Sequence, residues 1–556
     1  MRVSKLCTCL SAGSLAFAFG SVIFGGPIQG PLPAASQPSL SQSNGKPPWD
    51  APPAGDSYDN QIFFRLATLL QHWPNTRYPS GASIVPGTIP IGTTLYHGRS
   101  STELPPRPDW LAFDPEHSAL FTRGPSGRLF TFVTTRSLRV LYFDGSSAAK
   151  LSSGAVDTQD LLAWGHIGNQ TFGDEQALIN DLCKWGKPLG IDGYVRMEMS
   201  FEVMYCDFYQ GIEVVSSLHI LPPEESHMPG PPGNGPGGPP PSKELNLPDR
   251  SSAMKQRSLE AFQAGAWHRR APGEVRVRLD VARLVSLYDP ALRSGMKTRK
   301  GLEKIQHRGK GLSQEDIETF RTWVIDSVQP TAPATSGVDW QALTTVIMDR
   351  YSSRLEYLQL LLKPDHISAN ATAVVQDVRT ELMIMLMPDL TSDTVPRSAT
   401  RTTSSAAAHY SQLRRGEART DEWIKPILDH CSSYLVSHLP QDKFTREERT
   451  LYAGVSGTLH EICRVLSLLW SEAYDPLPTT PPVILIGRWR VQVDELIQWL
   501  DWPMWNKCTP ECDLDSICFI PTWPMGIGRG PGGKGEEDLT KVDWTPKCLH
   551  KKDESW

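Results

Sequence analysis

Two segments of this 556-residue chain carry the residue types best suited to chemistry. The first, Leu95-Tyr96-His97-Gly98-Arg99, reads as a short strand that ends in His-Gly. The second, residues 201–208, alternates as a strand does and carries Glu202. The chain has no Gly-x-Ser-x-Gly elbow and no His-Glu-x-x-His motif, so serine-hydrolase and zinc-protease chemistry are not indicated. A histidine and a carboxylate held by two strands are therefore the enzymatic pattern to test.

A structural interpretation of the same residues competes with the enzymatic one. A histidine at a strand end commonly makes only structural hydrogen bonds, and a glutamate in an alternating strand commonly faces solvent. Gly98 can serve only the turn that follows its strand.

The order of elements around these residues resembles the ADP-ribosyltransferase fold. After the His-Gly strand, Trp110–Phe121 reads as a strand entering a helix, and Gly190–Val195 precedes the strand that bears Glu202. Gly211–Val215 follows it, so the resemblance covers residues 93–216. It implies a mixed α+β domain whose substrate is NAD, with no other cofactor indicated.

This resemblance assigns roles residue by residue. His97 would hydrogen-bond a ribose hydroxyl, the Gly98 backbone would hold the nicotinamide amide, and Glu202 would stabilise the cationic ribose as nicotinamide departs. Tyr96, Arg99 and Phe113 would complete the dinucleotide site. The sequence departs from the family at Ala112-Phe113-Asp114, where a tyrosine or Ser-Thr-Ser is expected, because Phe113 lacks the hydroxyl.

A second resemblance covers most of the chain. Segments in the same order are similar to those of fungal secreted or membrane-anchored proteins of unknown function: residues 77–79, 84–90, 95–99, 110–114, 142–145, 157–160 and 518–526. This resemblance implies no activity. It leaves two hypotheses, a surface glycoprotein with a non-catalytic transferase-like domain, and an NAD-dependent ADP-ribosyltransferase or NAD glycohydrolase that uses Glu202.

The N-terminus predicts entry into the secretory pathway. Arg2 and Lys5 precede an almost uncharged, largely apolar run that ends near residue 26, and Ala16-Phe17-Ala18 is a candidate cleavage pattern. Residues 1–26 are either a cleaved signal peptide or a retained signal anchor. We therefore expect a secreted or cell-surface protein, attached to a membrane only if the anchor is retained.

The cysteines agree with an oxidising compartment. Eight of the ten lie beyond the leader, and an even number there predicts disulfides: Cys183, Cys206, Cys431, Cys463, Cys508, Cys512, Cys518 and Cys548. We expect Cys183 to pair with Cys206 and Cys431 with Cys463. The last four have the number but not the spacing of a zinc site, so disulfides are favoured over a metal. Asn169 and Asn370 lie in glycosylation triplets.

Composition divides the chain into further regions. A Pro/Ser-rich arm is expected at 27–60, an α+β domain at 61–221, a Pro/Gly-rich linker at 222–250, a mainly helical domain at 251–475, and an irregular Cys/Trp-rich tail at 476–556. The net charge of −6 argues against a nucleic-acid partner, and no other partner is indicated. Gly528–Lys534 half-matches a phosphate-binding loop, but Gly535 stands where a Ser or Thr should follow the lysine, so we expect Gly526–Gly535 to be a flexible loop and not a nucleotide site.

Overall fold

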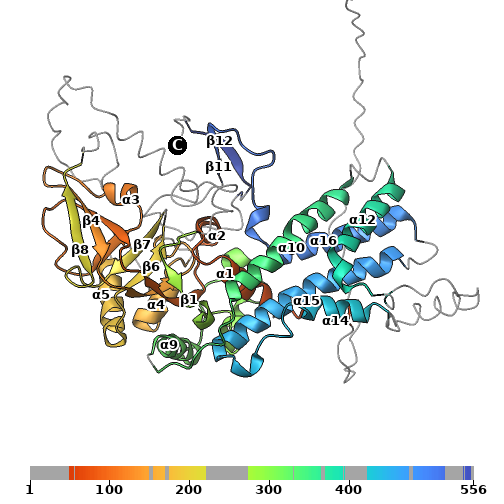
Figure 1. The fold of residues 1–556 in the computed structure, drawn as a ribbon, viewed down its shortest axis with the longest axis horizontal. Helices are drawn as coiled ribbons and strands as arrows, with labels where there is room; N and C mark the ends of the chain where they lie inside the picture. Colours follow the sequence, from red (N-terminus) through yellow and green to blue (C-terminus); the bar gives the residue numbers. More distant parts are fainter. Residues whose placement is uncertain are drawn as a thin grey trace, which may run out of the picture. The chain divides into compact units, whose positions relative to one another are not determined.

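The protein is a mixed α+β structure, seen in a computed structural model (Figure 1). The structure describes residues 49–55, 57–149, 154–168, 175–198, 200–220, 273–329, 331–364, 370–391, 394, 423–474, 480–519, 543 and 545–551. The predicted leader, most of the arm, the linker, Asn169 and the glycine-rich loop at 526–535 lie outside these residues. The predicted α+β class is confirmed.

One ten-stranded sheet organises the first part of the chain. Its order is β10-β1-β5-β6-β7-β3-β2-β4-β8, with β9 also paired to β1, and only β5 and β6 run parallel. The strands are β1 (Ser83–Ile89), β2 (Thr94–Arg99), β3 (Asp109–Ala112), β4 (Arg128–Thr134), β5 (Leu138–Phe143), β6 (Gly193–Met197), β7 (Phe201–Tyr205), β8 (Ile212–Leu218), β9 (Arg278–Leu279) and β10 (Val285–Ser286). Strands that are neighbours in the sheet are often far apart in sequence. Strand β7, for example, lies between β6 and β3.

Strand β1 was not predicted, because Pro86 and Gly87 interrupt its apolar pattern. One edge of β1 pairs with β5 along its whole length. On the other edge, β10 pairs with Ser83 and Ile84, and β9 pairs with Gly87 and Thr88. Pro86, which has no N–H to donate, therefore lies where one partner strand gives way to the next.

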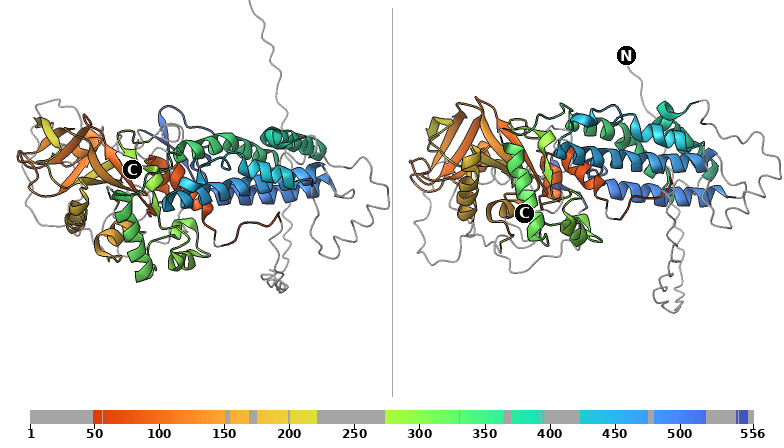
Figure 2. Two further views of the ribbon diagram at one scale, coloured as in Figure 1. Left: turned by 60° about the horizontal axis from the view of Figure 1, so that its bottom comes forward. Right: turned by 90° about the horizontal axis from the view of Figure 1, so that it is seen from below.

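Helices flank the sheet and make up most of the remaining described chain (Figures 1 and 2). They are α1 (Asp59–Ala67), α2 (His72–Arg77), α3 (Pro115–Ala119), α4 (Asp157–Trp164), α5 (Glu175–Gly186), α8 (Arg293–Arg299), α9 (Gln314–Val328), α10 (Trp340–Leu361), α12 (Ala371–Leu386), α14 (Lys425–Ser433), α15 (Arg446–Tyr474) and α16 (Pro482–Leu500). Ser313 caps α9, because its hydroxyl accepts from the Asp316 N–H at 3.2 Å. Leu355 and Leu358 of α10 are buried, as its helical spacing predicts.

The sheet region and the helical region share one hydrophobic core. Helix α1 packs on α15 so closely that a Cβ on Gly454 would lie 2.6 Å from Ile62 Cγ2, and one on Gly457 would lie 2.2 Å from Asp59 Oδ2. Strands β9 and β10 follow the predicted linker in sequence yet belong to the sheet. The boundary expected at 251 therefore does not separate sheet from helices.

The prediction of an irregular tail is wrong over α16. Pro482 occupies the first turn of this helix, and Trp489, Val493, Leu496 and Leu500 are buried along one side. In the part of the chain that the structure describes, none of the helices combines the length and the apolar character needed to cross a bilayer. Beyond α16, β11 (Ser516–Phe519) and β12 (Lys547–His550) form a two-stranded sheet.

Candidate functional site

The strand register determines which predicted site residues meet. Tyr96 on β2 pairs with Ala112 on β3, and Ala112 pairs with Glu202 on β7, so these three form one row across the sheet. Side chains in one row share a face, and the next residue along each strand points to the other face. His97 therefore lies on the face opposite Glu202. The structure does not bring the two predicted catalytic residues into one cleft.

His97 makes structural contacts on its own face. It is buried, its Nδ1–H donates to the Trp110 carbonyl at 2.7 Å, and its ring lies 5.4 Å from that of Phe208. Its Nε2 has no hydrogen-bond partner among the described residues and lies 4.0 Å from Asp109 Oδ2. Burial lowers the pKa of His97, so the neutral imidazole is favoured.

Gly98 has a packing role in this structure. A Cβ at this position would lie 1.7 Å from the Ser118 carbonyl oxygen. The close approach that glycine allows is therefore taken up by helix α3, not left open for a ligand.

Arg99 and Phe113, which were also predicted to bind the dinucleotide, contact other parts of the protein. Arg99 donates to the Glu103 carbonyl at 2.8 Å, and Tyr96 is half-buried. Phe113 is buried with the Arg276 guanidinium 4.9 Å from its ring centroid, and its carbonyl accepts from Arg276 Nη1 at 2.8 Å.

Glu202 is the centre of a buried polar cluster under α3. Its Oε1 accepts from Arg196 Nε at 2.6 Å, and its Oε2 lies 4.0 Å from His117 Nε2. Arg196 also pairs with Glu175. Burial disfavours the Arg196 charge, but the two carboxylates raise its pKa above the ordinary value. Glu202 thus faces packed protein and a fixed cation.

His117 and Glu198 complete this cluster, and the sequence prediction missed both. His117 is buried on α3, its ring stacks 5.6 Å from that of Trp110, and burial lowers its pKa. Glu198 lies in the turn between β6 and β7, where its N–H donates to the Ser200 carbonyl at 3.2 Å. The signal was spacing, because Glu198 follows the last residue of β6 and Glu202 is the second residue of β7, so both come to one end of a hairpin.

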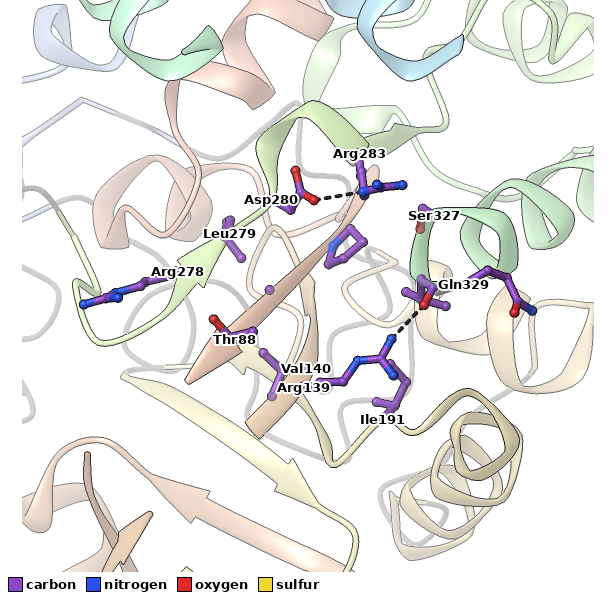
Figure 3. Close-up of a pocket in the computed structure, with 13 residues that line it drawn as sticks. Thr88, Arg139, Val140, Ile191, Arg278, Leu279, Asp280, Arg283, Ser327 and Gln329 are labelled. Carbon is purple, nitrogen blue, oxygen red and sulfur yellow. Dashed lines mark hydrogen bonds and ion pairs between the residues drawn. The ribbon is translucent and has the colours of Figure 1, made fainter. Parts of the chain in front are cut away.

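A pocket of about 660 Å³ lies elsewhere, between β1, β9 and α9 (Figure 3). Two of its three arginines are engaged: Arg139 donates to the Leu189 and Val328 carbonyls, and Arg283 donates to Asp280 and the Pro333 carbonyl. Figure 3 shows Arg139 reaching across to α9, while Arg278 points away from it. The pocket includes none of the predicted catalytic or dinucleotide-binding residues.

Four disulfides join the eight cysteines beyond the leader. Cys183–Cys206 and Cys431–Cys463 form as predicted. In the tail the pairs are Cys508–Cys518 and Cys512–Cys548. The tail sulfurs are therefore not available as thiolates for zinc.

Comparisons with known proteins agree with the fungal resemblance and supply no activity. A model of the YPL277C N-terminal domain matches residues 122–233. The chain is 25% identical to the uncharacterized protein YOR389W of Saccharomyces cerevisiae over 87% of this chain and 85% of that protein. It is 28% identical to the uncharacterized protein YPL277C of the same yeast over 57% of this chain and 80% of that protein. No solved structure matches the chain. The chain is thus similar to fungal proteins of unknown function.

Proposed function

We propose that this protein acts in the secretory pathway or outside the cell as a non-catalytic, disulfide-stabilised glycoprotein with a transferase-like sheet. The observation that carries the non-catalytic part is the register of β2, β3 and β7. An ADP-ribosyltransferase site needs its histidine and glutamate around one nicotinamide ribose, and here alternation directs His97 and Glu202 to opposite faces.

The environment of Glu202 supports the same reading. A carboxylate that stabilises an oxocarbenium-like centre must face the substrate. Glu202 is 4% exposed and hydrogen-bonded to Arg196, while α3 covers the sheet at Gly98. Opening this site would require breaking a buried ion pair, which is costly.

The disulfides support the proposed location. Cytosolic thiols are kept reduced, and multiple structural disulfides are typical of proteins folded in oxidising compartments. The Cα separations of the four pairs, 5.5 to 5.8 Å, match ordinary bridges. Asn370, a predicted glycan acceptor, is exposed.

The enzymatic part is tested by comparing NAD consumption by wild type, Glu202→Gln and His97→Gln, with nicotinamide release as the readout. We expect no turnover above buffer in any of the three. Turnover by wild type that both substitutions abolish would overturn the proposal and restore the NAD-consuming alternative.

The location is tested separately in a fungal host that expresses the full chain with a C-terminal tag. We expect the tagged protein in the medium or at the cell surface, with disulfides formed on non-reducing gels. Retention in the cytosol as a fully reduced protein would contradict the secretory assignment.

A further inference from the structure

The His117, Glu198 and Glu202 side chains form a group suited to a divalent cation. One potential ligand atom from each lies within 4.8 Å of the other two. The donors are an imidazole nitrogen and two carboxylate oxygens, a set that Zn²⁺ and Mn²⁺ accept. Among the described residues, the other such group consists of Cys508, Cys512 and Cys548, whose sulfurs are in disulfides.

The spacing between Glu202 and His117 matches a bridging ion better than a direct contact. Glu202 Oε2 and His117 Nε2 are 4.0 Å apart, which is beyond hydrogen-bond distance. Two metal–ligand bonds of ~2.0–2.2 Å at the tetrahedral angle place their donor atoms about 3.3–3.6 Å apart. An ion between these two atoms therefore requires them to approach each other by about 0.4–0.7 Å.

His117 supplies an observation independent of the carboxylates. Its side chain is 3% exposed. Its Nδ1 is buried without a hydrogen-bond partner among the described residues. A buried imidazole nitrogen without a partner costs free energy, so the described residues do not fully satisfy the His117 ring.

The neighbouring residues prepare Glu202 for this role. Arg196 holds Oε1 at 2.6 Å, which fixes the carboxylate plane and leaves Oε2 directed at His117. Carboxylates that bind a metal are usually held in place by further hydrogen bonds of this kind. Glu198 is half-buried, whereas His117 and Glu202 are buried.

We propose that His117, Glu198 and Glu202 bind one divalent transition-metal cation. The cation joins helix α3 to the β6–β7 hairpin. Its role is to tie a five-residue helix to the sheet it covers, and this role does not depend on where the protein is located.

The test uses the full chain with intact disulfides, stripped with a chelator and titrated with Zn²⁺ or Mn²⁺ by calorimetry. We expect one site per chain for at least one of the two ions, and a melting temperature that rises with ion concentration. No stoichiometric binding of either ion would overturn the proposal.

Matched variants locate the site. Glu198→Gln and His117→Gln are expected to weaken binding by roughly tenfold or more. Glu175→Gln, which removes a carboxylate that also contacts Arg196 but lies outside the cation set, is expected to bind as wild type. If His117→Gln fails to fold, Glu198→Gln decides, because that side chain is half-buried in a turn. Unchanged binding by Glu198→Gln overturns the assignment.

The donor atoms can be read directly. X-ray absorption of the zinc-loaded protein should show nitrogen and oxygen neighbours at ~2.0–2.2 Å and no sulfur shell. A sulfur shell at ~2.3 Å would move the ion to the cysteines and contradict the proposal.

Discussion

Lys304 donates to Asp501 across 2.8 Å, and this contact ties the loop after α8 to the end of α16. The Lys304 ammonium also lies 3.1 Å from the centroid of the Phe64 ring, and Arg77 donates to the same Asp501 carboxylate. Burial lowers the pKa of Lys304 to about 7, whereas the two cations hold the pKa of Asp501 below its usual value despite burial. The Asp501 carboxylate is thus the counter-charge that both Lys304 and Arg77 share.

Replacing Asp501 with asparagine should destabilise the protein by about 3–5 kcal/mol, because it leaves buried cations without their counter-charge. Asparagine tolerates the left-handed backbone at this position, where φ is 46°, so the charge is the main change. Urea unfolding measures the loss. A Lys304→Met variant, which keeps Arg77 as the partner of Asp501, should lose less, and equal stability of Asp501→Asn and wild type would contradict the prediction.

Gly98→Ala should destabilise the sheet region by ~1–3 kcal/mol or more, because its Cβ would lie 1.7 Å from the Ser118 carbonyl oxygen. Gly487→Ala is the matched control. That glycine lies within α16 with nothing within 4 Å of a Cβ, so alanine should raise stability by up to ~1 kcal/mol. Thermal unfolding checks both predictions: the melting temperature should fall for Gly98→Ala and rise for Gly487→Ala.

His307 should make the protein acid-sensitive. Its Nδ1 accepts from the Tyr288 hydroxyl at 3.1 Å, and its Nε2–H donates to the Leu302 carbonyl at 3.2 Å. Burial lowers its pKa to about 4, and the cations Arg299, Arg65 and Lys304 act in the same direction.

A folded-state pKa below the unfolded value of about 6.5 means that the unfolded chain binds the proton more readily. The stabilisation from neutral His307 is therefore present above pH ~6.5 and is lost as the pH falls towards 4. His307→Gln keeps one donor and one acceptor and should flatten this part of the stability–pH curve. The same slope in both proteins would assign the acid sensitivity to other groups.

The Cys431–Cys463 bridge joins α14 to α15, and replacing both residues with serine should cost ~2–4 kcal/mol. Mass spectrometry of a non-reducing digest should also recover Cys183–Cys206, Cys508–Cys518 and Cys512–Cys548. Cross-pairing between the two tail bridges would contradict the described tail structure.

Asn370 should carry an N-glycan, since it is exposed at the start of α12. Its side-chain oxygen accepts from the Thr372 and Ala373 N–H groups, so it also caps that helix. Asn370→Asp preserves the cap and should remove one glycan on gels without loss of stability, whereas Asn370→Ala should also cost ~1 kcal/mol. Identical mobility of wild type and Asn370→Asp after secretion would exclude the modification.

Local pattern was sufficient for elements whose sequence and environment agree. Helix α4 (Asp157–Trp164) and strand β6 (Gly193–Met197) can be predicted from their own residues. Strand β1 was missed because Pro86 and Gly87 oppose strand propensity, and only partner strands from later in the chain explain it. Helix α16 was missed because it begins with proline and its tryptophans belong to a Cys/Trp-rich segment that was expected to be irregular.

The candidate site shows a different limit. His97 and Glu202 were joined by resemblance, and spacing alone does not reveal that β3 lies between their strands. The same strand order gives Glu202 its actual neighbours, Arg196 on β6 and His117 above β3. Which histidine meets which carboxylate depends on register and strand order, and both are properties of the whole sheet.

The pairing of β9 and β10 with β1 also sets the order in which the protein can be completed during synthesis. Until residue 286 has left the ribosome, one edge of β1 has no partner strand and presents its backbone N–H and C=O groups. Chaperone engagement should therefore persist past the point at which β8 is made. For the same reason, an expression boundary for the sheet belongs after β10, since a fragment cut at 221 would carry an open, aggregation-prone edge.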